Sequence, residues 1–390
     1  MVIQKHSTDF ARGLVPEIDG LRGIAILLVL VHRLWPRTGT LARYASIPEL
    51  GWVGVDLFFV ISGLLIAGIL LDTREDAGYY KNFYARRALR IFPLYYAFVG
   101  LVFLAFPLME GGAYLRTAFI GETGSPLYYF LYLGNIPESV LGKDPPYVIA
   151  PVWSLAIEEQ FYITFPFLVA TLTRRNLTRV LVALALFAPL LRLASTIAWP
   201  ERERLQYQFT LCRVDVIAVG ALLAVGVRTN GFVERYRRHA PRMAWAALIV
   251  LGITIALGGL DRTMMFGRVV GYSVVAGGFG TLAFWTVMQR GTRATSLLRS
   301  SPLKYMGKLC YGLYLLHRPA DVMVTKALAR TPWPHIAETV AGVALKMGVA
   351  IGLAALSWRF FEKPILVFKR RFDSRRHPMA EHERLSARRR

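Results

Sequence analysis

Four charged or titratable side chains lie in and beside the first apolar run of the chain, DGLRGIAILLVLVHRLW at residues 19–35: Asp19, Arg22, His32 and Arg33. Ionisable groups are expensive to hold next to a membrane core and therefore mark candidate functional sites. On a helix, His32 would lie roughly 15 Å from Arg22, about half of the hydrocarbon thickness. His32 could then act as a general base deep in the membrane. The alternative is that Arg22 snorkels to lipid phosphates and His32 makes a helix-packing hydrogen bond.

A carboxyl group follows in the second apolar run, GWVGVDLFFVISGLLIAG. Asp56 stands among apolar residues, while Ser62 and Gly63 allow a neighbouring helix to approach closely. Asp56 is either a catalytic carboxylate that tunes the base or a structural partner for a cation such as Arg33.

Three arginines precede the third apolar run in NFYARRALRIFPLYY, at residues 82–96. Arg87 and Arg90 are three residues apart, so on a helix they point in the same direction. Two guanidinium forks on one face suit a polyphosphate ligand. The alternative is the ordinary positive charge that membrane proteins carry on their cytoplasmic side.

The fourth apolar run, PVWSLAIEEQFYITFPF, has a polar stripe of Ser154, Glu158 and Tyr162, with Glu159 beside it. Adjacent carboxylates in the first turns of a span are hard to explain by packing, and the helix dipole stabilises them by only about 1 kcal/mol. We therefore expect Glu158 to have a catalytic role. Ser154, Glu159 and Tyr162 are candidate polar groups on the acceptor side.

Two weaker signals come later in the chain. CRVDVIAVGALLA places Arg213 and Asp215 at the outer end of a run, either paired with each other or facing a polar cavity. KLCYGLYLLHRPAD places His317 in an apolar run, where a helix-packing hydrogen bond explains it as well as catalysis does.

The composition predicts an all-α polytopic membrane protein. Of the 390 residues, 55% are hydrophobic, and the mean hydropathy is +0.41. The net charge of +22 does not indicate a nucleic-acid partner, because the basic residues lie between apolar runs. The two cysteines provide neither a disulfide framework nor the ligand spacing of a metal site.

Ten apolar runs are long enough to be transmembrane helices. The alternate connections hold 31 Lys and Arg residues against 10 in the other set, which predicts that both termini are cytoplasmic. We expect a membrane domain over residues 1–365 and a basic, disordered cytoplasmic tail over 366–390. The runs lie at 17–36, 51–71, 91–108, 152–172, 179–199, 213–227, 243–260, 268–288, 309–328 and 337–361.

These stretches resemble the integral-membrane acyltransferase-3 family, the bacterial O-acyltransferases of surface polysaccharides and macrolides. The similarity covers about residues 15–365 and rests on seven motifs in the family's order: DGLRGIA…H, GVDLFFVISG, FYARRALRIFP, WSLAIEEQFY, RVDVIAVGALLA, YGLYLLHRP and FFEKP. The resemblance implies a multi-pass protein of the bacterial inner membrane. It also implies transfer of an acyl group, commonly acetyl, from acyl-CoA to a sugar hydroxyl, with acyl-CoA as co-substrate and no bound cofactor.

The resemblance assigns roles to particular residues. The family's arginine-to-histidine motif corresponds to Arg22 and His32, and its paired-arginine motif to Arg87 and Arg90. The three arginines would hold the CoA phosphates at the cytoplasmic face, and His32 would act as base or carry the acyl group covalently. A transporter or flippase that uses the same buried charges, and a non-catalytic scaffold, are the rival interpretations.

One departure from the family concerns helical phase. The family pattern has ten residues between the arginine and the histidine, whereas nine separate Arg22 from His32, and Arg33 occupies the expected position. At about 100° per residue, the shorter spacing rotates His32 by about 80°. Either a one-residue irregularity in the helix restores the alignment, or His32 faces elsewhere. Cys310 also stands where family members often have serine.

Overall fold

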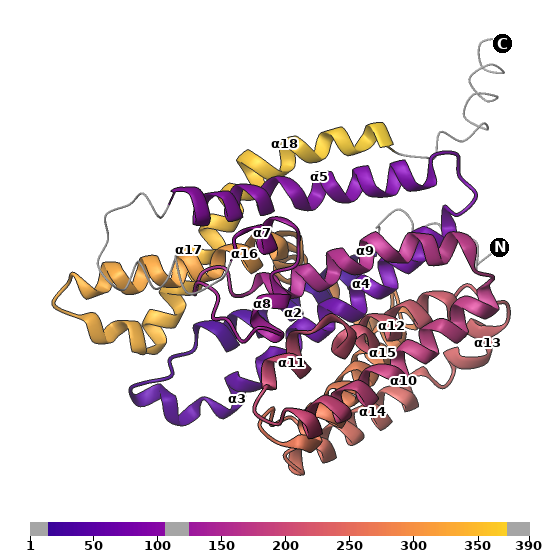
Figure 1. Ribbon diagram of the computed structural model, residues 1–390, viewed down its shortest axis with the longest axis horizontal. Coiled ribbons are helices and arrows are strands. Elements are labelled where there is room, and N and C mark those ends of the chain that lie inside the picture. The colour runs from indigo at the N-terminus through magenta and orange to yellow at the C-terminus, as the bar shows by residue number, and fades with distance from the viewer. Residues whose placement is uncertain (1–14, 106–124, 373–390) are drawn as a thin grey trace, which may run out of the picture.

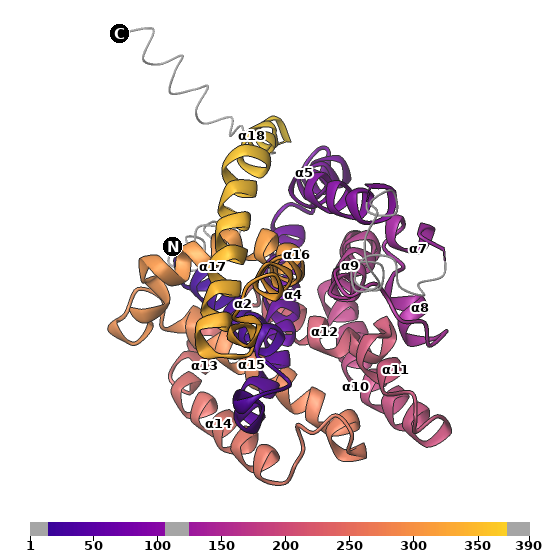
Figure 2. The ribbon, with the colours of Figure 1, turned by 90° about the vertical axis from the view of Figure 1, so that its left-hand side faces the viewer.

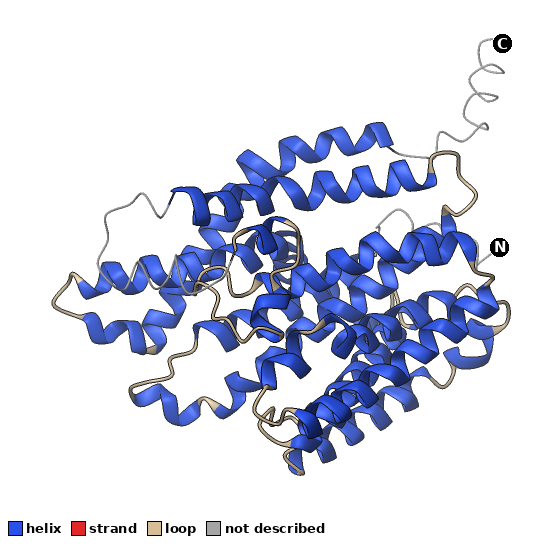
Figure 3. Cartoon of the chain, in the orientation of Figure 1, coloured by secondary structure: helices blue, strands red, loops and turns tan. Residues whose placement is uncertain are grey.

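The computed structural model describes residues 15–105 and 125–372. Within these two segments the chain folds into helices joined by loops, without a strand (Figure 3). A helix lies in each of the ten predicted apolar runs: α2 (Pro16–Leu34), α4 (Val53–Asp72), α5 (Tyr79–Gly100), α9 (Val152–Thr171), α10 (Arg174–Ala198), α12 (Thr210–Gly226), α14 (Ala240–Ala256), α15 (Tyr272–Met288), α16 (Ser301–Ala329) and α17 (Val340–Ser357).

Shorter helical segments connect these helices or extend them. They are η1 (Thr40–Tyr44), α3 (Ser46–Glu49), η2 (Leu50–Trp52), η3 (Leu101–Ala105), α7 (Leu127–Phe130), α8 (Asn135–Ser139), α11 (Glu203–Gln208), α13 (Phe232–Arg237), η5 (Gly267–Gly271), η6 (Arg293–Thr295), η7 (Leu297–Arg299), η8 (Pro334–Glu338), η9 (Trp358–Glu362), α18 (Lys363–Leu366) and η10 (Val367–Phe372).

Six helical stretches of the described segments are long and apolar enough to cross a membrane, so the chain is a multi-pass membrane protein. The full set of ten spans and the cytoplasmic location of both termini stay predictions. At 19, 20 and 29 residues, α2, α9 and α16 are also long, but polar residues interrupt their apolar faces. The six stretches are Leu50–Asp72, Tyr79–Leu104, Arg174–Ala198, Glu203–Gly226, Gly267–Met288 and Val340–Phe372.

The centre of the bundle consists of α2, α4, α12 and α16 (Figures 1 and 2). α2 packs against α16 on one side and α4 on the other, and α4 also packs along α12. Small residues permit these close contacts. A β-carbon at Gly307 of α16 would overlap the backbone carbonyl of Asp19 in α2, and one at Gly63 of α4 would overlap that of Ile217 in α12.

A hydrogen-bonded junction fixes α9 against the neighbouring elements. The amide of Gln160 in α9 donates to the side-chain oxygen of Asn135 in α8 over 3.0 Å and accepts from the hydroxyl of Thr210 in α12 over 2.5 Å. Each buried amide group is thereby given a partner, which buried polar groups require. The junction fixes the height of α9, and with it the position of its carboxylates, relative to α12.

Two helices begin earlier than the apolar runs indicate. α5 begins at Tyr79 rather than near residue 91, and α16 begins at Ser301 rather than near residue 309. Arg87 and Arg90 therefore lie inside a helix and not before it. Hydropathy does not predict the polar first turns of the two helices, because the charged side chains there face an internal cavity.

The end of the chain is more ordered than the sequence predicts. Residues 363–372 are helical, as α18 and η10, and both elements lie along α5 (Figure 1). The disordered tail is predicted to begin at residue 366, but residues 366–372 are helical. The rest of the predicted tail, 373–390, lies outside the described residues.

Candidate active site

A cavity of about 440 Å³ lies between α2, α4, α5, α9 and α16. It extends along α16 from Lys304 to Tyr314, roughly 15 Å at the helical rise. We call the Lys304 side of the bundle its basic end and the other side its opposite end. The size is within the range of small-molecule and cofactor sites.

Positive charge dominates the cavity wall. Carboxyl groups come only from Asp19, Glu158 and Glu159 among the described residues that line it. The lining cations are Arg22, Arg86, Arg87, Arg90, Lys304, Lys308 and Lys369. Such an excess of like charge within one apolar-walled space attracts anions and focuses their approach.

Arg22 connects two helices at the middle of the cavity. Its guanidinium donates to the Sγ atom of Cys310 on α16 over 3.0 Å and lies 3.5 Å from the carboxylate of Asp19, one turn earlier on α2. This geometry leaves part of the guanidinium fork facing the cavity that Arg22 lines. Arg22 therefore lines the cavity, and its contact with a ligand stays a prediction.

Arg87 and Arg90 line the same cavity from α5. The guanidinium carbon of Arg87 lies over the ring of Tyr162, 5.6 Å from its centroid. Neither arginine forms an ion pair with a carboxylate of residues 15–105 or 125–372. Unpaired guanidinium groups facing a cavity are suited to bidentate contacts with phosphate.

The two carboxyl groups of α9 have different surroundings. Glu158 accepts a hydrogen bond of 2.5 Å from the hydroxyl of Ser62 on α4, and Tyr162 donates to that hydroxyl over 3.3 Å. Glu159 is buried, and its Oε1 atom has no hydrogen-bond partner among the described residues. Of the two carboxyl groups of α9, one is thus held by a neighbouring hydroxyl and one has an oxygen without a partner among the described residues.

Hydroxyl groups form the inner end of the cavity. The Ser154 and Tyr314 hydroxyls are 2.6 Å apart, and Tyr314 also donates to the backbone carbonyl of Pro151 over 3.0 Å. His317 lies one turn further along α16, with its ring centroid 6.0 Å from that of Tyr314.

The hydrogen bonds of His317 fix its tautomer when the ring is neutral. Its Nδ1 atom faces the backbone carbonyls of Tyr314 and Leu313 at 2.8 and 3.3 Å. Because carbonyl oxygens only accept, Nδ1 carries the proton and Nε2 keeps a free lone pair. Nε2 is buried without a partner among the described residues. His317 itself does not line the cavity; it lies one turn beyond Tyr314, which does.

His32 has a different environment. α2 is an unbroken α-helix from Pro16 to Leu34, so no irregularity restores the alignment with Arg22. His32 is buried at 2% exposure, its Nδ1 atom contacts the carbonyl of Pro48 at 3.1 Å, and it does not line the cavity. Its catalytic role stays a prediction that the cavity geometry does not support.

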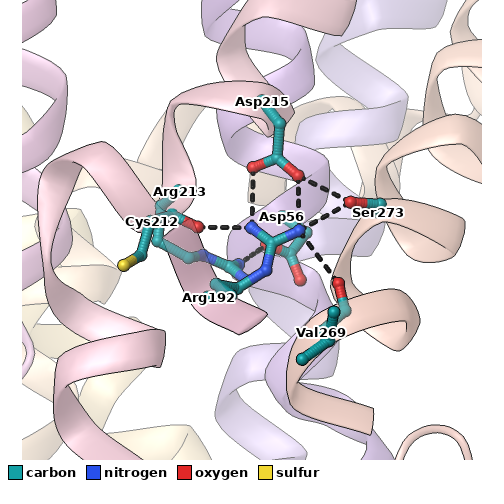
Figure 4. Close-up of polar contacts among 7 residues, drawn as sticks. All are labelled: Asp56, Arg192, Cys212, Arg213, Asp215, Val269 and Ser273. Carbon is teal, nitrogen blue, oxygen red and sulfur yellow. Dashed lines mark hydrogen bonds and ion pairs between the residues drawn. The ribbon is translucent and has the colours of Figure 1, made fainter. Parts of the chain in front are cut away.

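Asp56 and Asp215 each pair with an arginine in the core (Figure 4). Arg213 contacts Asp56, while Arg192 of α10 forms a bidentate pair with Asp215 at 3.1 and 2.8 Å. Asp56 is thus a partner of a buried cation, as one of its two interpretations predicts, but the cation is Arg213 and not Arg33. Asp215 pairs with Arg192 and not with Arg213. None of these four residues lines the cavity, so they act as helix-to-helix connections.

Sequence reasoning missed several residues of this region, among them two lysines and an arginine. Lys304 and Lys308 line the cavity, and Arg192 holds Asp215. A single arginine inside the apolar stretch VLVALALFAPLLRLAS was a usable signal, because a lone buried cation needs a partner. The two lysines gave no comparable signal, since they precede the apolar run that defined the helix.

Comparison with known proteins identifies the family of the chain. Residues 15–358 match the model of the acyltransferase domain known as acyltransferase 3. The chain belongs to the acyltransferase-3 family. Most of the residues that line the cavity lie within the matched segment.

Among curated proteins, the chain is similar to three named O-acetyltransferases. It is 27% identical to the peptidoglycan O-acetyltransferase OatA of Listeria monocytogenes over 93% of this chain and 57% of the relative. It is 28% identical to the putative peptidoglycan O-acetyltransferase YrhL of Bacillus subtilis (95% and 58%) and 28% identical to O-acetyltransferase OatA of Staphylococcus aureus (90% and 57%).

The chain thus spans somewhat more than half the length of the curated relatives it matches. No solved structure matches the chain. The transporter interpretation has no support among these relatives.

Proposed function

We propose that this acyltransferase moves an acyl group, acetyl by analogy with the relatives, from acyl-CoA to a hydroxyl of a cell-surface glycan. The observation that carries the proposal is the basic cavity, which begins at Lys304 and ends at the Ser154–Tyr314 hydroxyl pair. The names of the relatives make peptidoglycan the first acceptor to examine. The protein would lie in the bacterial inner membrane with its basic end in the cytoplasm, as the charge distribution predicts.

The basic wall supports acyl-CoA as the donor. Several cations face few carboxylates there, and coenzyme A carries its phosphates at one end of a long, flexible arm. Arg87 and Arg90 would bind the phosphates, with Arg22 deeper along the same wall. The arm would then follow the cavity toward Tyr314, so that the thioester reaches the inner end roughly 15 Å away.

The chemistry requires a base for the acceptor hydroxyl. In the transfer, the oxygen of the acceptor forms an ester bond with the acyl carbon, the carbon–sulfur bond breaks, and the thiolate leaves. The hydroxyl proton goes to the base, and the thiolate takes up a proton on release. Neither histidine lines the cavity, but His317 lies one turn beyond Tyr314, which does, and its Nε2 atom has no partner among the described residues. We therefore favour His317 as the base.

The two histidines can be separated by one comparison. Transfer of labelled acetyl from acetyl-CoA is measured for His317→Ala, His32→Ala and the unchanged protein. Loss of a general base lowers the rate by about 100- to 10,000-fold, and we expect that loss for His317→Ala, with a smaller effect for His32→Ala. Acetyl-CoA affinity should change little in either variant. If His32→Ala loses acetyl transfer while His317→Ala keeps its transfer rate, the base is His32.

A further inference from the structure

Three arginines gather at the opposite end of the bundle, beyond the inner end of the cavity. Arg33 lies in the last turn of α2, Arg318 lies on α16, and Arg262 lies in the turn between α14 and η5. Arg33 is within electrostatic range of both other arginines. We call these residues the arginine cluster.

No carboxylate of the described residues forms an ion pair with any member of the cluster. Instead, aromatic rings support the cations. The guanidinium carbon of Arg262 lies 5.0 Å from the ring centroid of Tyr207, and that of Arg318 lies 3.9 Å from that of Tyr147. A ring face attracts a cation but cancels no charge and leaves the N–H edges of the guanidinium unoccupied.

The acid best placed in sequence to neutralise Arg318 is already occupied. Asp321 is three residues further along α16, but it lies 2.7 Å from Nζ of Lys346 and accepts a 2.5 Å hydrogen bond from Tyr147. Repulsion within the cluster is therefore not balanced by this carboxylate.

Glu138 of α8 is the other carboxyl group near the cluster, and it is also a poor counter-charge. Arg33 and Arg318 are both within its electrostatic range, yet its side chain is buried and its Oε1 atom has no partner among the described residues. Burial raises the pKa of Glu138 well above its usual value, which favours the neutral acid.

Arg318 supplies an independent sign of a missing ligand. It is only 9% exposed, and its Nε donor has no partner among the described residues. Leaving a buried donor without a partner costs about 1–3 kcal/mol, and more for a charged group. Natural proteins rarely keep such a donor unless a ligand or water completes it.

We propose that the arginine cluster binds an anionic group, carboxylate or phosphate, on the acceptor glycan. The proposal rests on the proposed function, because it assigns the second substrate of that reaction. Arg318 lies one helical turn, about 6 Å, beyond Tyr314. An acceptor held there by its acidic group would present a neighbouring hydroxyl to His317 and to a thioester arriving through the cavity.

The cluster would also select between acceptors. Guanidinium groups bind carboxylate and phosphate through paired N–H contacts, and a neutral sugar of the same size cannot make those charge-assisted bonds. A neutral acceptor would leave the three cations without a counter-charge, so acidic glycans should be preferred.

The experiment uses the purified full chain in detergent, without coenzyme A. Thermal unfolding is followed as glucuronate, inorganic phosphate or glucose is added. A ligand that binds the folded state raises the melting temperature in a saturable way. We expect glucuronate, phosphate or both to do so and glucose not to; the more effective anion identifies the acidic group of the acceptor.

Variants of cluster residues test whether the anion that raises the melting temperature binds at the arginine cluster. Arg33→Gln and Arg262→Gln should each raise the half-saturating concentration by at least about tenfold, the loss of one charge-assisted contact. Arg37→Gln is the matched control, because Arg37 follows α2 on the same side of the bundle but pairs with Glu49 over 2.6 Å. Arg262 lies in a surface turn, so its variant is informative even if Arg33→Gln folds poorly.

Two results would overturn the proposal. In the first, neither anion stabilises the unchanged protein more than glucose does. In the second, the anion effect survives Arg33→Gln and Arg262→Gln but is lost in Arg90→Ala, which would place the anion in the basic cavity. Acetyl-CoA affinity, measured on the same samples, separates these results from a failure of the proposed function.

Discussion

Replacement of Arg90 by alanine tests donor binding with little risk to the fold. Arg90 lines the cavity, has no carboxylate partner among the described residues, and lies in repulsive range of Arg22 and Arg87. Its removal therefore breaks no ion pair of the described residues and relieves repulsion. The loss should be limited to one charge-assisted phosphate contact, about 1.5–3 kcal/mol, which corresponds to roughly 10- to 150-fold in the dissociation constant of coenzyme A.

Isothermal titration of the purified protein with coenzyme A measures this change. Arg90→Lys should recover only part of the affinity, because an ammonium group cannot reproduce the bidentate fork. Lys81→Ala is the matched control, since Lys81 is an exposed cation on the same helix and does not line the cavity. Repeating the titration with dephospho-coenzyme A shows whether Arg90 contacts the ribose phosphate. Unchanged affinity in both Arg90→Ala and Arg87→Ala would refute the donor assignment.

Three further predictions concern stability and topology. Asp56→Ala leaves Arg213 buried without its partner and should destabilise the fold by about 3–5 kcal/mol, whereas Asp144→Ala, which breaks an exposed pair, should cost less than about 1 kcal/mol in the same thermal unfolding assay. Because the pKa of Glu138 is raised in the folded state, stability should fall as pH rises above the carboxyl's usual value, and Glu138→Gln should flatten that dependence; an unchanged profile would contradict it. A cytoplasm-dependent reporter fused after Arg390 should be active, and activity of a periplasm-dependent one would contradict the predicted topology.

The positions of the long helices could be predicted from the sequence, because each apolar run contains a helix. The polar stripe of α9 could also be predicted from the sequence. Ser154, Glu158 and Tyr162 recur at four-residue intervals, and all three line the cavity. Helical periodicity alone places such residues on one face.

The partners of buried charges could not be predicted, because pairing depends on how helices pack. Asp215 is two residues from Arg213 in sequence but points to Arg192 on another helix. The direction in which the His32 side chain points depends on its helical phase relative to Arg22. Because α2 is unbroken, the side chain that shares a face of the helix with Arg22 is Arg33, roughly 20° away around the helix axis, and not His32. Arg33, which occupies the position expected for the histidine, also contributes a cation to the arginine cluster.

The central claim is that a thioester from the basic end meets an acceptor hydroxyl from the opposite end. Proteoliposomes loaded with radiolabelled acetyl-CoA and supplied externally with a peptidoglycan-derived saccharide test it directly. We expect an alkali-labile acetyl ester on the external saccharide, together with an equal amount of free coenzyme A thiol inside, and loss of both in Arg90→Ala at limiting donor. Labelled material that crosses the membrane without thioester cleavage, or cleavage that never acylates the external saccharide, would contradict it.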